Sequence, residues 1–91
     1  MIQQSEEGYS WKVNYLATMP LHEQLKNRIQ AHIKSGQLRT GNLLPGTRVL
    51  SRTLSISNAT SKMAYKLLEE EGSIVHVKGQ GYVVSAPSEP N

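Results

Sequence analysis

The chain has 91 residues, no cysteine and a formal net charge of +3, which predicts one small domain without disulfide bonds or a cysteine-based zinc site. It contains no apolar run long enough to span a membrane and no secretory signal sequence, so we expect a cytoplasmic protein with no membrane partner. Nine of the ten Lys and Arg residues, but only four of the seven acidic residues, lie between Pro20 and Tyr82, and this basic centre suits an anionic partner such as nucleic acid.

The N-terminal segment, residues 1–19, has an alternating pattern only over residues 10–15. There Trp11, Val13 and Tyr15 alternate with polar residues, which predicts a short edge strand. The residues before this alternation have no apolar period, and we expect them to fray.

A long helix is predicted next, over residues 19–36. Thr18 or Pro20 would open it, since proline is favoured in a first helical turn, and Gly36 would end it. Its apolar side chains recur every four residues and predict one buried stripe, made of Leu21, Leu25, Ile29 and Ile33.

A turn-rich connection and a second, short helix follow. The connection, residues 37–48, contains three leucines that we expect in the core, namely Leu38, Leu43 and Leu44. The second helix is predicted over residues 47–54, with Thr47 as the residue that caps its first turn. Three apolar side chains of this helix are expected to face inward: Val49, Leu50 and Leu54.

A third helix is predicted over residues 57–71, with Ser57 as its N-cap. The side chains expected on its buried face follow a three- and four-residue spacing and are Ser61, Ala64, Tyr65 and Leu68. Two short β-rich runs joined by residues 79–81 then predict a hairpin, and residues 86–91 look like a linker or tail. This order predicts an α+β fold over residues 20–85, a winged helix-turn-helix with three helices and a C-terminal β-hairpin wing.

The third helix combines a small, polar first turn with a basic outward face. Asn58, Lys62 and Lys66 lie opposite the buried face. A recognition helix enters the major groove with its first residues nearest the base edges, where Asn58 can pair with adenine and Ala59 and Thr60 can contact a thymine methyl. Lys62 and Lys66 can reach phosphates, whereas the three glutamates at the far end belong away from the duplex. A capped helix with a solvated face is the alternative interpretation of the same residues.

Four motifs follow one another between Pro20 and Val84: P-L-x-x-Q, I-x-x-G-x-L-x-x-G-x-x-L-P-x-x-R-x-L, S-x-x-T-x-x-x-A-Y-x-x-L-x-x-E-G and G-x-G-Y-V. In this order and spacing they resemble the winged helix-turn-helix DNA-binding domain of GntR-type bacterial transcription regulators. The Ala64-Tyr65 pair and the early strand are most similar to the branches called YtrA-like and MocR-like. The resemblance implies sequence-specific binding of double-stranded DNA, with the helix 57–71 in the major groove and the wing 78–82 at the minor groove.

The resemblance also implies roles by position. Arg48 falls where family members place an arginine at the DNA, the recognition-helix contacts fall between Asn58 and Lys62, and Gly79 falls where the backbone approaches the minor groove. Arg52 and Lys66 are added as candidate phosphate contacts. The full set of candidate DNA-binding residues is Arg48, Arg52, Asn58, Ala59, Thr60, Lys62, Lys66, Lys78, Gly79 and Gln80.

Each of these assignments has a structural alternative. Arg48 could act as a cap or bridge to Glu69 or its neighbours, and Arg52 could lie on a solvated face. Asn58 could support the helix cap, and Thr60 could bond back to the helix backbone. The geometry of a hairpin turn is sufficient to explain Gly79.

The chain departs from the family pattern on the recognition helix. Asn58 stands where Arg is frequent, Ala59 where Thr is frequent, and Ser61 where a buried Val is usual. The first two changes leave the operator sequence open, and the third predicts a thinner core at Ser61.

Family regulators usually carry a second domain after the wing, which binds an effector and helps to dimerise. We therefore expect a fragment rather than a stand-alone binder, from a homodimeric regulator that meets a small-molecule effector only through that further domain. The alternative function is a winged-helix protein-protein interaction module without DNA readout. No catalytic motif is present, and His22, His32 and His76 lack metal-ligand spacing, so we expect no enzyme activity, metal or cofactor.

Overall fold

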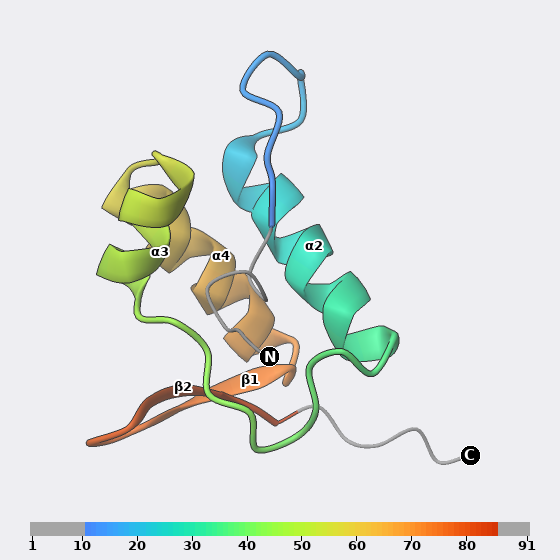
Figure 1. Cartoon of the computed structure of the whole chain (residues 1–91), viewed down its shortest axis with the longest axis vertical. Helices are drawn as coiled ribbons and strands as arrows, with labels where there is room; N and C mark the ends of the chain where they lie inside the picture. Colours follow the sequence, from blue (N-terminus) through green and yellow to red (C-terminus); the bar gives the residue numbers. More distant parts are fainter. Residues whose placement is uncertain (1–10, 86–91) are drawn as a thin grey trace, which may run out of the picture.

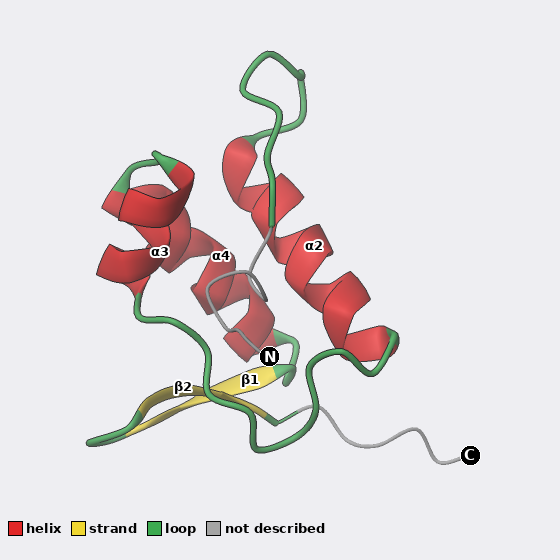
Figure 2. Ribbon diagram, in the orientation of Figure 1, coloured by secondary structure: helices red, strands yellow, loops and turns green. Residues whose placement is uncertain are grey.

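The computed structural model describes residues 11–85, so the expectations for residues 1–10 and for the tail at 86–91 lie outside the described chain. Three helices are followed by a two-stranded antiparallel hairpin, which confirms the predicted α+β winged helix-turn-helix (Figure 1; Figure 2). The elements are α2 (Leu21–Lys34), α3 (Thr47–Leu54), α4 (Asn58–Glu70), β1 (Ile74–Val77) and β2 (Gly81–Val84). In Figure 1 the hairpin lies beneath the three helices, and the connection between α2 and α3 runs beside it.

Helix α2 has the boundaries that its flanking residues predict. It begins directly after Pro20, and Gly36 follows its last turn with a φ of 88°, a left-handed conformation that glycine adopts at little cost. The predicted apolar stripe faces the core, and its four members are buried or half-buried: Leu21, Leu25, Ile29 and Ile33.

Residues 11–15 form no strand, so the predicted edge strand is wrong. The side chain of Gln24 takes the place of a neighbouring strand. Its Oε1 accepts a hydrogen bond from the Asn14 amide at 2.7 Å, and its Nε2 donates to the carbonyl oxygens of Asn14 and Met19 at 3.0 and 2.8 Å. Backbone groups of the loop are therefore satisfied by a side chain of α2. Trp11 is nevertheless fully buried and anchors this loop in the core.

Helix α3 divides its apolar side chains between core and surface. Leu50 is buried and Leu54 packs against the core, as predicted, but Val49 is 51% exposed. Successive helical residues are rotated by about 100° around the axis, so Val49 does not share the inward direction of Leu50. The N-cap is Gly46, and Thr47 is the first helical residue, so the predicted Thr47 cap is wrong.

The connection between α2 and α3 pairs with the outer side of β2. The Leu44 amide donates to the Tyr82 carbonyl oxygen at 2.8 Å, and Leu43 forms an isolated β-bridge with Val83. Neighbouring residues of an extended chain point in opposite directions, so Leu44 is buried whereas Leu43 is 53% exposed. The predicted core positions of Leu38 and Leu44 are confirmed, and that of Leu43 is wrong.

Helix α4 agrees most closely with its sequence pattern. Ser57 caps it, as predicted, because the Ser57 Oγ accepts a hydrogen bond from the Thr60 amide at 3.0 Å. The residues predicted for the buried face are all fully buried: Ser61, Ala64, Tyr65 and Leu68. This face packs against α2 and α3 and leaves the opposite face of α4 toward solvent.

The wing is connected to α4 through aromatic rings. Its strands pair antiparallel in the register Ile74–Val84, Val75–Val83, His76–Tyr82 and Val77–Gly81. The Tyr82 ring meets the ring of Tyr65 edge-on, with 4.7 Å between their centroids. The orientation of the wing is therefore coupled to the core of the helix-turn-helix.

Candidate nucleic-acid interface

The outward face of α4 is basic. Asn58, Lys62 and Lys66 follow one another at four-residue intervals and so share a face opposite the buried stripe. Both lysines are exposed, and neither forms a salt bridge with a residue in the described range 11–85. Their charges are available to an anionic partner.

The first turn of α4 is held together by hydroxyl groups. The Ser57 hydroxyl, which caps the helix, also lies 2.8 Å from the hydroxyl of Thr60. Thr60 is half-buried, and its hydroxyl contacts the side chain of the capping serine, whereas the structural alternative for this residue was a bond to the helix backbone. Ala59 is exposed and small, so it leaves room for a partner to approach the helix backbone.

Asn58 is half-buried, and its amide oxygen turns toward α3. Its Oδ1 lies 3.5 Å from the hydroxyl of Ser51. That hydroxyl is also 3.3 Å from the Ser57 carbonyl oxygen and 2.7 Å from the hydroxyl of Ser61. Ser51 was missed in the sequence analysis, because the hydroxyl pair joins two helices and follows no motif.

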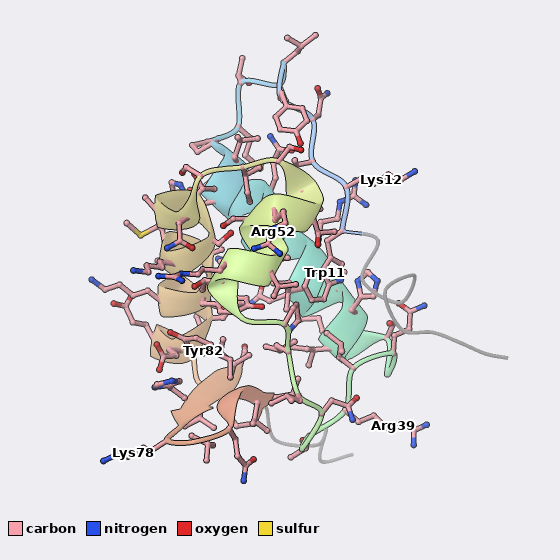
Figure 3. The ribbon with its side chains drawn as sticks, turned by 60° about the vertical axis from the view of Figure 1, so that its left-hand side comes forward. Trp11, Lys12, Arg39, Arg52, Lys78 and Tyr82 are labelled. Carbon is pink, nitrogen blue, oxygen red and sulfur yellow. The ribbon has the colours of Figure 1, made fainter. Side chains whose placement is uncertain are left out.

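The two arginines of α3, Arg48 and Arg52, are exposed. Neither forms a salt bridge within residues 11–85, so the alternative bridge from Arg48 to Glu69 is not formed. The segment that leads into Arg48 is fixed, because the Tyr65 hydroxyl donates a 2.6 Å hydrogen bond to the Pro45 carbonyl oxygen. Figure 3 shows Arg52 on the outer side of α3.

The wing turn consists of Lys78, Gly79 and Gln80, all exposed. The Gln80 amide donates to the Val77 carbonyl oxygen at 2.9 Å, and Gly79 has a φ of 84°, a conformation that L residues rarely adopt. Apart from Gly79 itself and its two chain neighbours, no heavy atom of the described structure lies within 4 Å of the place that a Gly79 Cβ would occupy. The hairpin explains the glycine, and the open space leaves its backbone accessible. In Figure 3 Lys78 projects from the wing on the side opposite Arg39.

The acidic end of α4 is partly turned toward the body of the protein. The Glu71 carboxylate pairs with the Lys26 ammonium at 2.9 Å and accepts a hydrogen bond from the Gln30 amide, both on α2. Burial, and after it the negative charge of Glu69, raises the pKa of the Tyr82 phenol above its ordinary value. Of the acidic side chains at the end of α4, Glu71 is therefore engaged in contacts within the protein.

Met63 is a surface residue that the sequence analysis missed. It is 42% exposed, lies four residues after Ala59 and stands beside Lys62 on the outward side of α4. The spacing from Ala59 was a sufficient signal to find it. An apolar side chain in this place can contact a thymine methyl.

Within residues 11–85, no group of three or more His, Cys, Asp or Glu side chains is arranged to hold a metal ion. None of the helices described is both long and apolar enough to cross a membrane. Five cations are exposed on α3, on the outward face of α4 and on the wing turn, which suits the binding of an anionic surface: Arg48, Arg52, Lys62, Lys66 and Lys78.

Comparison with known proteins places these features in a family. A family profile described as bacterial regulatory proteins, gntR family, matches residues 21–84. The HTH-type transcriptional regulator GgaR of Escherichia coli K12 is 37% identical over 62 residues, which are 68% of this chain and 25% of GgaR. The structure of YtrA from Sulfolobus acidocaldarius, a GntR-family transcription factor, matches with a TM-score of 0.79 and 32% identity over 85% of this chain and 81% of YtrA.

The DNA-binding domain of AraR, solved in complex with operator ORX1, has the same fold, with a TM-score of 0.71 and 24% identity over 80% of this chain and 90% of that domain. This chain spans about a quarter of the length of GgaR. The resemblance inferred from the four motifs is confirmed, because the profile match covers most of the chain. The chain therefore belongs to the gntR family of bacterial regulatory proteins, a family of transcription regulators.

Proposed function

We propose that residues 20–85 bind double-stranded operator DNA with sequence specificity, as the N-terminal domain of a cytoplasmic transcription regulator. The helix 57–71 would enter the major groove, and the wing 78–82 would lie at the minor groove. The observation that carries this proposal is a set of exposed cations on α3, on α4 and on the wing turn, none of them in a salt bridge within the described chain: Arg48, Arg52, Lys62, Lys66 and Lys78.

The shape of α4 supports insertion into the major groove. An α-helix with its side chains is about 10–12 Å across, close to the roughly 12 Å width of the groove. Small side chains in the first turn let the helix backbone come near the base edges. Lys62 and Lys66, one and two turns further along, can then reach the phosphates that border the groove.

Three groups of residues would contact different parts of the DNA. Asn58, with Ala59 and Met63 beside it, would meet base edges, and the half-buried Thr60 would hold the first turn in place. Arg48 and Arg52 would contact the backbone from α3. The wing turn, with Lys78 and Gln80 on either side of Gly79, would lie along the minor groove and its phosphates.

Relatives support the proposal at the level of the fold and of the whole regulator. The AraR domain, which shares this fold, was solved in complex with an operator. GgaR is about four times as long as the matched segment, which agrees with a regulator that carries a further domain. We propose that this further domain binds a small-molecule effector and forms a homodimer, so that two copies of the present domain read two half-sites.

The proposal is tested by selecting duplexes from a random DNA library with the 91-residue chain and titrating the selected duplex with salt. An enriched motif, with an affinity that falls steeply as salt rises, is the expected result, because each phosphate contact releases counterions. Binding without enrichment would assign specificity to dimerisation or to the further domain. Absence of binding even at low salt would overturn the proposal and favour a protein-interaction module.

A further inference from the structure

Ser51 and Ser61 form a buried hydroxyl pair between α3 and α4. Ser61 has no exposed surface, Ser51 is 9% exposed, and their oxygens are 2.7 Å apart. The pair lies directly beneath the first turn of α4, because the Ser51 oxygen is also 3.3 Å from the Ser57 carbonyl oxygen and 3.5 Å from Asn58 Oδ1. A polar cluster thus connects the core of the helix-turn-helix with the residue proposed to read a base.

The direction of these hydrogen bonds follows from counting protons. Each serine hydroxyl has one proton and can also accept. Within residues 11–85, the Ser61 hydroxyl contacts the hydroxyl of Ser51, and a fully buried O–H donor is rarely left without an acceptor. Ser61 therefore donates to Ser51. The single proton of Ser51 is then shared between its two remaining neighbours, the Ser57 carbonyl oxygen at 3.3 Å and, as the longer contact, Asn58 Oδ1 at 3.5 Å.

We propose that Ser51 is a positioning residue for DNA readout, which holds the amide of Asn58 with its oxygen inward and its NH2 group toward the DNA. This inference rests on the proposed function and deepens it. Oxygen and nitrogen occupy the two branches of a planar amide, so an oxygen engaged at α3 leaves the two N–H donors on the outer side. Asn58 then presents donors, and no acceptor, to the major groove.

A donor-only amide has a different base preference from a free one. The usual pairing of Asn with adenine is bidentate and needs the amide oxygen to accept from adenine N6. Guanine presents two acceptors, N7 and O6, in the same groove. At the position contacted by Asn58, the protein therefore prefers guanine to adenine, although the residue type by itself suggests adenine.

The test compares wild-type protein with Asn58→Ala, Ser51→Ala and Ser61→Ala on duplexes in which each position of the selected operator carries each base in turn. Asn58→Ala identifies the contacted position, where the wild-type protein prefers guanine. Ser51→Ala frees the amide to rotate, so the preference for guanine over adenine falls by about five- to tenfold at that position. Ser61→Ala removes the buried pair but leaves the Ser51 proton for Asn58, so it keeps the wild-type preference and serves as the matched control.

A further variant keeps the test informative if the serine variants unfold. Asn58→Asp has the same shape but presents only acceptors, so it loses affinity for guanine and gains relative affinity for cytosine, whose N4 is a donor. Urea denaturation of each variant separates loss of folding from altered readout.

The inference is overturned if Ser51→Ala keeps the wild-type preference at the position that Asn58→Ala identifies, and DNA binding by this domain then still stands. It is also overturned if Ser61→Ala shifts the preference as much as Ser51→Ala, since the pair would then act through helix packing. If the wild-type chain enriches no duplex, the proposed sequence-specific binding by this domain fails. That result differs from the two outcomes described for Ser51→Ala and Ser61→Ala.

Discussion

The Tyr65 hydroxyl donates a 2.6 Å hydrogen bond to the carbonyl oxygen of Pro45 and so connects the recognition helix to the segment that leads into Arg48. The same ring lies edge-on to Tyr82 of the wing, with 4.7 Å between centroids. Tyr65 is fully buried, so its ring has a fixed place in the core. Two parts of the proposed interface therefore depend on one residue of α4.

Replacing Tyr65 with Phe keeps the ring and removes the hydrogen bond to Pro45. We expect the free energy of unfolding to fall by about 1 kcal/mol, since the carbonyl oxygen of the half-buried Pro45 loses its donor. DNA affinity should fall as well, because Arg48 becomes less restrained. Urea denaturation and duplex titration measure the two effects, with Tyr15→Phe as a control whose hydroxyl bonds to the Leu54 carbonyl oxygen on another part of the surface.

A double-mutant cycle shows whether the effect on DNA passes through Arg48. If it does, Tyr65→Phe combined with Arg48→Ala weakens binding by less than the sum of the two single changes. Strictly additive losses would contradict a coupling between these residues.

Replacing Lys62 with Ala should weaken binding to all duplexes alike. Lys62 is exposed on the outward face of α4 and is assigned to a phosphate, so its loss should reduce the magnitude of the slope of log affinity against log salt by about 0.9. Arg39→Ala is the matched control, because it removes the same charge from an exposed side chain that projects on the side opposite Lys78 (Figure 3). Equal slopes of log affinity against log salt for the two variants would mean that Lys62 does not contact a phosphate.

Replacing Gly79 with Ala tests the wing. Apart from residue 79 itself and its two chain neighbours, no heavy atom of the described structure lies within 4 Å of the new Cβ, so the cost to folding comes from the positive φ of 84° and is about 1 kcal/mol. Gly36→Ala is a matched control at α2, where φ is 88° and the space is equally open. We expect similar losses of stability in urea, but a loss of DNA affinity for Gly79→Ala alone. Similar affinities for both variants would mean that the wing backbone does not approach the DNA.

The helices could be predicted from the sequence where one period accounted for all the apolar residues. The buried face of α4 has a single interpretation, because Ser61, Ala64, Tyr65 and Leu68 fit one three- and four-residue spacing. In α3 the helix is only eight residues long, and a short helix with adjacent apolar residues leaves the inward direction ambiguous. Val49 was misplaced for that reason.

Contacts between side chains distant in the sequence could not be predicted. The alternation of Trp11, Val13 and Tyr15 satisfies a strand pattern, but a strand also needs a partner, and Gln24 supplies the hydrogen bonds instead. Similarly, the family pattern predicted a thinner core at Ser61. It could not show that the Ser61 hydroxyl contacts the hydroxyl of Ser51 on another helix. The exposure of Lys62 and Lys66 could be predicted, because helical spacing places them opposite the buried face, whereas Arg48 and Lys78 became candidates through the family resemblance.

The two predicted caps provide a comparison within one protein. Ser57→Ala removes the acceptor of the Thr60 amide and should lower the free energy of unfolding by about 1 kcal/mol, which corresponds to roughly 4–8 °C in melting temperature. Thr47→Ala removes a side chain that caps nothing, so its effect should stay within about 0.5 kcal/mol. Thermal unfolding of the two variants measures the difference. A larger loss for Thr47→Ala would contradict the observed cap at Gly46.

The raised pKa of Tyr82 predicts a loss of stability at alkaline pH. Burial is the first cause and the charge of Glu69 the second, and both disfavour the phenolate in the folded protein. An unfolded tyrosine ionises at about pH 10, so the folded state holds this proton more tightly than the unfolded chain. The contribution of Tyr82 to the free energy of unfolding is fully present below that pH and is lost as the pH rises through the pKa of the folded state.

Urea midpoints should therefore fall more between pH 8 and about pH 11 for the wild-type protein than for Tyr82→Phe. The other ionising groups remain in Tyr82→Phe, so their effects cancel in the comparison. Glu69→Gln should show an intermediate fall, because only the second cause is removed. An equal fall for the wild-type protein and Tyr82→Phe would mean that the phenol of Tyr82 titrates alike in the folded and unfolded states.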